Sequence, residues 1–365
     1  MSKKKLFLID AYALIFRAYY AFIKNPVVNS KGFETSAILG FFNSIFDIKR
    51  REKPDYISVV FDKGGSKDRT AIYSEYKSNR TATPEVILES VPYIYNILNG
   101  LGITTLDLEG YEADDIIGTV AKNAEKNGFQ VYMVTPDKDF AQLVTENIFL
   151  YKPARFGNGI EIMGIDEINK KFEIDSPIKV IDYLGMMGDS VDNIPGIPGV
   201  GDKTAKKFIR DYGSIDGLYE NTHELKGKLR EKVEENHDLA MLSKKLATII
   251  TDVPITYELE SLKISKPSSE QIMSIFDELE FKRLKESYFK LFNDNNGETE
   301  IKQTEIKDEC RGNFITQQIS GKIGILIIKQ KIKESKLFAF DIKFYENDIY
   351  LCLCWTTAST YFIKM

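Results

Sequence analysis

The sequence predicts an α/β fold in which helices flank a central, mostly parallel sheet. Short runs of apolar and β-branched residues, KLFLID, YISVVFD and FQVYMVT, are typical of strands. They alternate with longer stretches whose apolar residues recur at helical spacing. This alternation is the pattern of parallel βαβ units.

The elements follow in order along the opening part of the chain. KLFLID is the first strand, and a helix-like stretch follows it to Arg51. YISVVFD is the second strand, and the next helix runs from near Pro84 to Asn99. The third helix lies within YEADDIIGTVAKNAEKNG, and Gly128 ends it before the strand FQVYMVT.

The rest of the chain has a different pattern. From Asp166 to Phe292 it is nearly all helical and is broken by IPGIPGVG, as expected of a helical subdomain that faces DNA. The polar stretch NDNNGETEIKQTEIKDE is typical of a linker. IGILII, LFAFDI, IYLCLCW and TYFIKM resemble short strands of an unfinished domain.

Cysteine and histidine are too few for several classes of site. Cys310, Cys352 and Cys354 lie late in the chain and provide neither a disulfide framework nor a four-ligand zinc site. His223 and His237 are the only histidines, and both lie in a charged stretch typical of solvated helix. The sequence therefore argues against a histidine-based triad and a zinc hydrolase.

The charge and the N-terminal run bear on partners and compartment. A formal net charge of -5 argues against a protein that coats nucleic acid nonspecifically, although it leaves room for local basic patches. The apolar run near the N-terminus contains Asp10 and lacks a small-residue cleavage site, so we do not interpret it as a signal peptide. No uncharged apolar stretch approaches the length that spans a bilayer. We expect a cytoplasmic protein with no membrane partner.

An aspartate stands at the end of each strand-like run. Asp10 ends LFLID, Asp62 ends ISVVFD, and Asp137 ends VYMVTPD. Turn formation explains any one of them but explains the coincidence of three poorly. Because active sites in an open parallel sheet form beyond the carboxyl ends of the strands, we expect these side chains to converge.

Four more acids are expected at the same end of the sheet. They are Glu112, Asp114 and Asp115 at the start of the third helix, and Asp139 beyond the third strand. Helix capping accounts for one acid there, not for three. Clustered carboxylates repel one another, so they should either take up protons or bind cations. Oxygen ligands select Mg²⁺ or Mn²⁺, and two such ions about 4 Å apart would hydrolyse a phosphodiester by in-line displacement.

The segment GDSVDNIPGIPGVGDKTAKKFI adds acids, glycines and lysines. Asp189 and Asp192 extend the acidic set. The glycine turn would expose backbone N–H groups at a helix N-terminus to a DNA phosphate, with lysines adding charge. The residues concerned are Gly196, Gly199, Gly201, Lys203, Lys206 and Lys207. A solvated lysine-rich face explains any single lysine equally well. Asp202, between Gly201 and Lys203, breaks the spacing of a nucleotide-binding P-loop.

A basic and aromatic segment, KGGSKDRTAIYSEYKSNRTATP, separates the second strand from the next helix. Its charged and aromatic residues include Lys67, Arg69, Tyr73, Tyr76, Lys77 and Arg80. Together they would hold a single nucleic-acid strand by charge and stacking. An exposed loop with an amphipathic helix is the simpler interpretation of any one of them. The nearby Asp62 favours a functional role for Lys77 and Arg80.

The ordered series FD, YKSNR, YEADD, TPDKD, GDSVDN and IPGIPGVGDKTA resembles the motifs of the 5′ nuclease domain of bacterial DNA polymerase I. The resemblance implies a PIN-like α/β nuclease core over 1–175, with a helical arch at about 63–85. It implies a helix-hairpin-helix DNA-binding subdomain over 176–292. A polar linker over 293–312 and an incomplete 3′ to 5′ exonuclease-like domain over 313–365 follow.

The resemblance also implies roles for individual residues. Two or more Mg²⁺ or Mn²⁺ ions would be bound by nine acids: Asp10, Asp62, Glu112, Asp114, Asp115, Asp137, Asp139, Asp189 and Asp192. Lys77 and Arg80 would act at the scissile phosphate. DNA would be held by Lys67, Arg69 and Tyr76 of the arch and by Gly196, Gly199, Gly201, Lys203, Thr204, Lys206 and Lys207 of the hairpin. The hairpin would also take a monovalent cation in some members of the family.

Some positions depart from the family pattern. Ala11 stands where relatives often have glycine, and Asp68 stands where an aromatic residue is usual. In the tail, Asp341 matches the first acid of a proofreading domain, but Lys343 replaces its glutamate. We therefore expect no two-metal site in the tail, and no DNA synthesis by this chain.

The leading hypothesis is a monomeric, structure-specific 5′ to 3′ exonuclease and flap endonuclease. Its substrates would be DNA with a 5′ flap, a nick or a free 5′ end and RNA-primed DNA, in primer removal and repair. A PIN-type metal nuclease that acts on RNA would share the acids but should lack the glycine hairpin. A flap- or nick-binding module without catalysis should have lost some of the acids.

Overall fold

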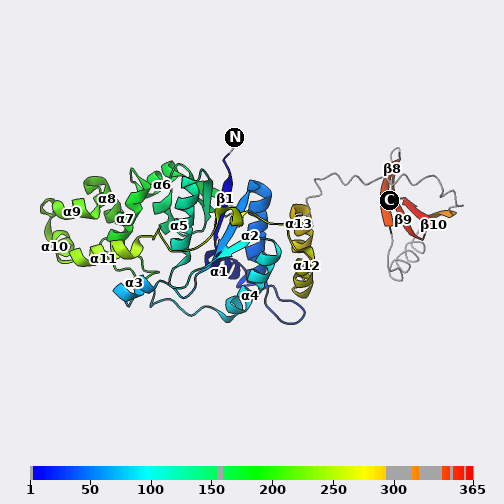
Figure 1. Cartoon of the computed structure of the whole chain (residues 1–365), viewed down its shortest axis with the longest axis horizontal. Helices are drawn as coiled ribbons and strands as arrows, with labels where there is room; N and C mark the ends of the chain where they lie inside the picture. The colour runs from blue at the N-terminus through cyan, green and yellow to red at the C-terminus, as the bar shows by residue number, and fades with distance from the viewer. Residues whose placement is uncertain are drawn as a thin grey trace. The chain divides into compact units, whose positions relative to one another are not determined.

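The computed structural model describes residues 3–153 and 159–292 and, further on, the backbone of four strands between residues 315 and 364. It divides into two compact units, Met1–Asn293 and Asp294–Met365 (Figure 1). The first unit contains a six-stranded sheet and the second a four-stranded sheet. The expected linker over 293–312 and the strand-like run IGILII lie outside the described residues.

The sheet of the first unit has the order β3-β2-β1-β4-β5-β6. Its strands are β1 (Lys5–Asp10), β2 (Tyr56–Val60), β3 (Thr104–Leu106), β4 (Gln130–Val134), β5 (Ile148–Lys152) and β6 (Glu161–Met163). Neighbouring strands are parallel except for β5 and β6. The predicted α/β fold with a mostly parallel sheet is confirmed. The sequence pattern did not reveal β3, β5 and β6, and β3 and β6 have only 3 residues each.

The helix-like stretch after β1 forms two helices, α1 (Ala11–Phe22) and α2 (Ser36–Glu52). Between them, Val28 and Glu34 form an antiparallel bridge around a turn in which Gly32 has a φ of 81°. A left-handed residue and the proline at position 26 both stop helix propagation. The two helices pack closely, because a Cβ on Gly40 would lie 2.7 Å from the Ala18 Cβ.

Both faces of the sheet are buried. Phe7 and Ile9 of β1 pack on one face with apolar residues of α1, α2 and α4 (Glu85–Gly100). Leu6 and Leu8 pack on the other face with α5 (Ala113–Lys126). Alternate residues of a strand point to opposite faces, so a continuous apolar run suits a strand covered on both sides. This sandwich fixes the carboxyl ends of β2, β1 and β4 side by side.

A group of helices follows the sheet in the sequence. They are α6 (Ile165–Phe172), α7 (Val180–Met187), α8 (Asp202–Tyr212), α9 (Ile215–Glu220), α10 (Gly227–Glu235) and α11 (His237–Ala247). Short 3₁₀ helices are η1 (Asp139–Leu143), η2 (Pro177–Lys179), η3 (Thr222–Glu224) and η4 (Leu259–Leu262). None of the described helices is long and apolar enough to cross a membrane.

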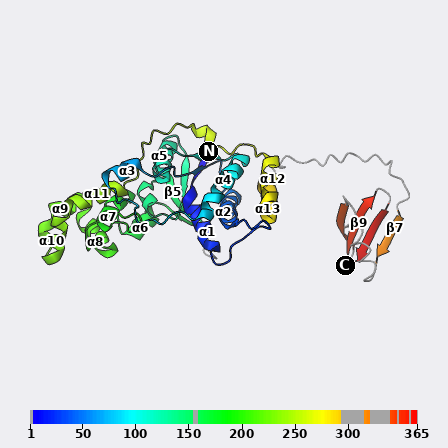
Figure 2. The same ribbon diagram turned by 90° about the horizontal axis from the view of Figure 1, so that it is seen from below.

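The last part of the first unit returns to the sheet. After α11 the chain is mostly extended, and Ser265 and Ser268 donate backbone hydrogen bonds to the carbonyls of Gly102 and Gly100 at 3.0 and 2.7 Å. α12 (Ser269–Glu278) and α13 (Lys282–Phe292) then pack in the cluster that includes α2 and α4. Figures 1 and 2 show them at the end of the unit opposite to α8–α11. The stretch expected to be helical up to Phe292 thus forms two separate groups of helices: α6–α11, and α12 and α13, which pack with α2 and α4.

The sheet of the second unit has the order β7-β10-β9-β8. Its strands are β7 (Ile315–Ile319), β8 (Ala339–Tyr345), β9 (Asp348–Thr356) and β10 (Ser359–Lys364). β8, β9 and β10 overlap the strand-like runs LFAFDI, IYLCLCW and TYFIKM and form an antiparallel meander. Asp341 and Lys343 lie two positions apart on β8.

Candidate active site

Three strand-end aspartates lie at one edge of the sheet. Asp10 is the last residue of β1 and caps α1, because its Oδ1 accepts a hydrogen bond from the Ala13 N–H at 3.1 Å. Asp62 follows β2 and accepts the Ala113 N–H at 2.9 Å, at the start of α5. Asp137 follows β4 and accepts the Asp139 N–H at 3.0 Å. β2, β1 and β4 are neighbours, so the parallel topology gathers all three.

A pocket of about 440 Å³ opens at this edge. Its lining includes the acids Asp10, Asp62, Glu112, Asp114 and Asp137 and the cations Lys77 and Arg80. The pocket therefore contains side chains from the ends of three strands, the start of α5 and the 73–80 turn. A second pocket, of about 410 Å³ and lined by residues such as Asn43 and Tyr151, contains none of the expected site residues.

The start of α5 carries the densest group of carboxylates. Glu112, Asp114 and Asp115 each offer an oxygen within 4.8 Å of the others, a spacing that could hold a metal ion. Capping does not explain the group, because Glu112 is the N-cap residue yet makes no side-chain capping bond. Asp114 accepts the Asp115 N–H at 2.7 Å, and this is the one local helix bond among the three carboxylates.

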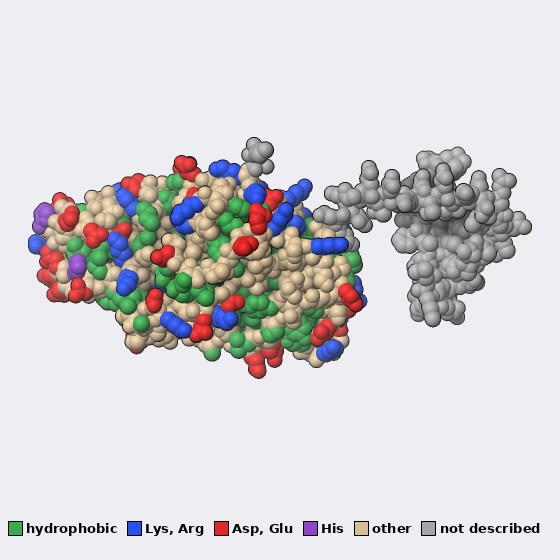
Figure 3. Space-filling view, in the orientation of Figure 1, with side chains coloured by type: hydrophobic (Ala, Val, Ile, Leu, Met, Phe, Trp, Pro, Cys, Tyr) green, Lys and Arg blue, Asp and Glu red, His purple; other side chains and the backbone are tan. Residues whose placement is uncertain are grey.

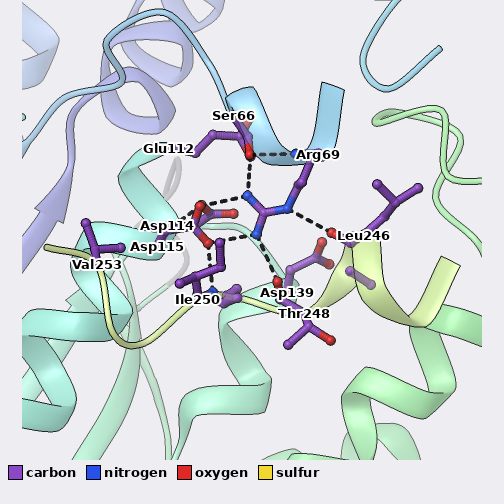
Figure 4. A network of polar contacts seen from close by, with 12 residues as sticks. Ser66, Arg69, Glu112, Asp114, Asp115, Asp139, Leu246, Thr248, Ile250 and Val253 are labelled. Carbon is purple, nitrogen blue, oxygen red and sulfur yellow. Dashed lines mark hydrogen bonds and ion pairs between the residues drawn. The ribbon is translucent and has the colours of Figure 1, made fainter. Parts of the chain in front are cut away.

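Arg69 lies in the interior beside this group and is only 3 % exposed (Figure 4). Its Nη atoms donate to Asp115 twice at 2.7 Å and to Glu112 at 2.9 Å. Its remaining N–H groups donate to the carbonyls of Leu246 at 3.0 Å and Thr248 at 2.9 Å. All five guanidinium N–H groups are thus satisfied within the protein.

Two residues expected to contact DNA are therefore placed differently. Arg69 is enclosed by Glu112, Asp115 and the C-terminal end of α11, so it positions acids and offers no surface to a strand. Tyr76 is 8 % exposed, and its hydroxyl donates to Glu112 at 2.9 Å. The interpretation of both as DNA-gripping side chains needs this correction. Long polar side chains turn inward here because buried carboxylates require donors.

Other basic residues pair with Glu112 and with two further acids, Asp189 and Asp192. Lys77 Nζ lies 2.6 Å from Glu112 and 3.6 Å from Asp192. Arg80 also pairs with Asp192. Lys138 Nζ lies 2.6 Å from Asp189. Lys138 stands between two expected ligands in TPDKD, and only the fold reveals that it balances a third acid.

Among the nine expected metal ligands, those without a cation partner in the described part of the chain are Asp10, Asp62, Asp114, Asp137 and Asp139. Burial, together with the charges of Asp62 and Asp137, raises the pKa of Asp10 to about 7. Burial also raises the pKa values of Asp62 and Asp137. The pKa values of Asp114 and Asp139 lie well above the ordinary range, because of burial and then the charges of Asp115 and Asp137 respectively.

Glu112 shows the opposite effect. Burial opposes its ionisation, but the charges of Lys77 and Arg69 outweigh burial and lower its pKa.

Asp139, unlike Glu112, has a carboxylate oxygen without a partner among the described residues: its Oδ1 is buried and makes no hydrogen bond with them. Buried polar oxygens rarely lack a partner, and a cation would supply one. The unpaired acids thus fit the oxygen-rich coordination that divalent ions prefer.

The glycine hairpin lies between α7 and α8. Gly188 and Gly196 both have positive φ, and a Cβ on Gly196 would lie 2.4 Å from the Gly188 nitrogen, so the two backbones touch. Gly201 is the N-cap residue of α8, and Gly199 lies against the Lys232 side chain. This close backbone approach leaves the turn before α8 as a rigid hairpin.

The basic residues of the two expected DNA-binding regions differ in exposure. Lys203 and Lys207 are exposed on α8, whereas Thr204 and Lys206 are half-buried and Lys206 pairs with Asp202 at 3.2 Å. Lys67 is exposed and pairs with Glu109 at 2.8 Å. On the face in Figure 3, basic and acidic side chains are interspersed and do not form one continuous basic surface.

A parallel sheet whose carboxyl edge gathers buried acids, with cations and a rigid hairpin close by, defines a metal-dependent nuclease. Family models agree with this class. Residues 5–173 match the 5′-3′ exonuclease N-terminal resolvase-like domain, and residues 175–270 match the 5′-3′ exonuclease C-terminal SAM fold.

Curated relatives identify the family. The chain is 37% identical over 289 residues to a 5′-3′ exonuclease of Aquifex aeolicus, covering 79% of this chain and 96% of that protein. It is 41% identical over 287 residues to DNA polymerase I of Bacillus subtilis, covering 78% of this chain. It spans 32% of that polymerase, about a third of its length. The chain belongs to the 5′-3′ exonuclease family.

Solved structures share the fold. A T5 5′-exonuclease with bound divalent metal ions (zinc) has a TM-score of 0.59 at 19% identity, covering 79% of this chain and 99% of that one. The catalytic core of Rad2 in complex with a DNA substrate has a TM-score of 0.52 at 19% identity, covering 80% and 93%. A T5 flap endonuclease in a complex with DNA and metal ions has a TM-score of 0.57 at 20% identity, covering 78% and 98%.

Proposed function

We propose that this chain is a structure-specific 5′ to 3′ exonuclease and flap endonuclease that hydrolyses phosphodiester bonds with two or more Mg²⁺ or Mn²⁺ ions. The observation that carries the proposal is the set of five acids at the sheet edge that have no cation partner among the described residues. Asp10, Asp62, Asp114, Asp137 and Asp139 would hold the ions. Bound there, the ions would activate a water and stabilise the leaving oxygen.

The chain's own residues supply binding and orientation. Lys77 and Arg80 line the pocket, and their charges would bind the scissile phosphate and hold it against the acids. The N-terminus of α8 and the exposed Lys203 and Lys207 would bind the phosphates of the duplex without reading its sequence. Such backbone contacts favour recognition of a nick, a flap or a free 5′ end by shape.

The family and the relatives support a substrate class. We infer DNA with a 5′ flap, a nick or a free 5′ end, and RNA-primed DNA, as substrates in primer removal and repair. The complexes of T5 flap endonuclease and Rad2 with DNA support this inference. We propose that the protein acts as a cytoplasmic monomer and, by its likeness to DNA polymerase I, as the N-terminal part of that enzyme. A monovalent cation at the hairpin is a further proposal.

The division into domains is also proposed. The nuclease core would comprise residues 1–175, with the arch at about 63–85. The helix-hairpin-helix subdomain would comprise residues 176–292, and its last helices, α12 and α13, pack with α2 and α4 of the core. A linker over 293–312 would lead to the incomplete 3′ to 5′ exonuclease-like domain over 313–365.

The test is cleavage of a labelled 5′-flap DNA with Mg²⁺, with and without EDTA. Asp114→Asn keeps an acceptor for the Asp115 N–H while removing a charge. We expect cutting near the flap junction to fall at least about 10³-fold in this variant and in EDTA. Asp252→Asn, at an exposed acid, is the matched control and should cut like the wild type.

Other outcomes would separate the alternatives. Cutting that survives both EDTA and Asp114→Asn would defeat the metal mechanism. Tight binding of the flap without cutting by the wild type would favour a non-catalytic module. Faster cutting of a matching RNA than of the DNA flap would favour an RNA-directed enzyme.

A further inference from the structure

Two loops that are distant in sequence meet beside the acid pocket. The first is the turn over 73–80, which carries Lys77 and Arg80 and contains no helix or strand. The second is the loop over 188–196, which follows α7 and forms the first part of the glycine hairpin between α7 and α8. Contacts between these loops therefore influence where the two basic side chains stand in the pocket.

Internal contacts brace the 188–196 loop. Asp189 and Ile194 exchange backbone hydrogen bonds of 2.9 and 2.8 Å across it, and Asp189 Oδ1 accepts the Val191 N–H at 2.8 Å. The backbone contact of Gly188 with Gly196 closes its base. A loop fixed at its base and across its middle is a firm support for a neighbouring segment.

Asn193 projects from this support into the 73–80 turn. Its Nδ2 donates to the Glu75 carbonyl at 2.7 Å and to Ser78 Oγ at 3.3 Å. The same carbonyl accepts the Ser78 N–H at 3.1 Å, so the Asn193 amide closes the turn from outside. Asn79 adds a second link, because its Nδ2 donates to the Ser190 carbonyl at 2.7 Å.

The backbone of Lys77 needs such support. Its φ is 56°, a left-handed conformation that a residue with a Cβ adopts only at a cost in free energy. The Lys77 N–H donates to the Asp192 carbonyl at 2.9 Å, which fixes this conformation from the 188–196 loop. In that conformation the Lys77 ammonium reaches Glu112.

We propose that Asn193 is a positioning residue of the nuclease. Its amide holds the 73–80 turn on the 188–196 loop and thereby ties the placement of Lys77 and Arg80 to the hairpin ahead of α8. This inference rests on the proposed function, in which the two cations act at the scissile phosphate and the hairpin binds duplex. Duplex binding and the placement of the two cations are then mechanically linked.

The test variant is Asn193→Gly. Asn193 itself has a φ of 56°, which glycine adopts without strain, so the substitution removes the amide and leaves the loop backbone undisturbed. We expect the single-turnover rate on Mg²⁺-loaded 5′-flap DNA to fall at least about tenfold, because misplaced catalytic groups lose rate steeply. Duplex affinity in EDTA should stay within about twofold, since the hairpin is intact.

A double-mutant cycle asks whether Asn193 acts through the cations. In a Lys77→Ala, Arg80→Ala background, Asn193→Gly should cause no further loss of rate. An equal fold-loss in both backgrounds, or a wild-type rate in Asn193→Gly alone, would overturn the proposal. Asn79→Ala removes the exposed link and should show a smaller loss of rate than Asn193→Gly.

A readout without activity separates this inference from the proposed function. Trypsin should cut after Lys77 and Arg80 faster in Asn193→Gly than in wild type, because the released turn fits a protease more readily. Equal digestion rates would show that Asn193 does not hold the turn, even if the wild type cleaves DNA. A wild type that cleaves no flap would refute the proposed function, and the digestion would still decide the role of Asn193.

Discussion

Two groups of carboxylates meet at the same sheet edge but are neutralised in different ways. Glu112, Asp115, Asp189 and Asp192 have protein cations within bonding distance. Asp10, Asp62, Asp114, Asp137 and Asp139 have none among the described residues, and the pKa values of all five are raised, first of all by burial. The comparison teaches that the protein balances only part of its own charge. The unbalanced part is where we expect an external cation to stabilise the fold.

Breaking the internal pairing should have the largest effect. Arg69→Met removes the guanidinium that neutralises Glu112 and Asp115 while keeping an unbranched side chain. Asp115 loses its cation partner and Glu112 keeps only Lys77, so we expect the free energy of unfolding to fall by about 3–5 kcal/mol. Urea unfolding measures this loss in the free energy of unfolding. Lys207→Met, at an exposed lysine, is the control, and a loss in Arg69→Met no larger than in this control would refute internal pairing.

Adding Mg²⁺ tests the second group, the five acids without a cation partner in the described part of the chain. Mg²⁺ at about one hundred times its dissociation constant should stabilise the folded protein by about 2.7 kcal/mol, because only the folded chain gathers the acids. Scanning calorimetry at about pH 8 should show this as a higher Tm, and Asp114→Asn should reduce the shift. The shift should shrink as the pH falls, since protons compete for the same oxygens. An identical shift in Asp114→Asn would place the ion elsewhere.

The smallest expected effect is a gain in stability. The pKa of Asp10 is raised to about 7, so its favourable contribution is complete at low pH and is lost as the pH rises through about 7. Asp10→Asn removes that charge and keeps the cap on α1, since asparagine caps as well as aspartate.

In the metal-free protein at about pH 8, Asp10→Asn should raise the free energy of unfolding by on the order of 1–2 kcal/mol. The gain should decline as the pH falls, and saturating Mg²⁺ should remove or reverse it. Urea unfolding across pH follows the trend. A variant less stable than wild type at every pH would show that Asp10 is not under charge repulsion.

The sequence could predict the strand-end acids because parallel strands carry their carboxyl ends to one edge, and a run such as ISVVFD reveals both the strand and its end. The split between α1 and α2 was less visible, although Pro26 and Gly32 mark it. β3 and β6 are too short for a periodic signal. The return of α12 and α13 depends on tertiary packing, since amphipathic helices carry no information about which surface they will cover.

The site was predictable in its acids and less so in its cations. Arg69 and Tyr76 look like surface residues in a basic segment, yet both are buried against Glu112. Pairing of a basic residue with an acid 43 positions away depends on the fold and leaves no local pattern. The link between Asn193 and the 73–80 turn was hidden for the same reason.

The return of the chain to the sheet has a consequence for where a substrate would be cut. Helices α6–α11 leave the sheet layer after β6 and are followed by α12 and α13, which pack back onto it, so they form an insertion held at both ends. A hairpin mounted on such an insertion stands at a set distance from the acids. A duplex bound there would lie at a fixed distance from the acid pocket. The incision should therefore fall a constant number of nucleotides from the junction, whatever the length of the flap.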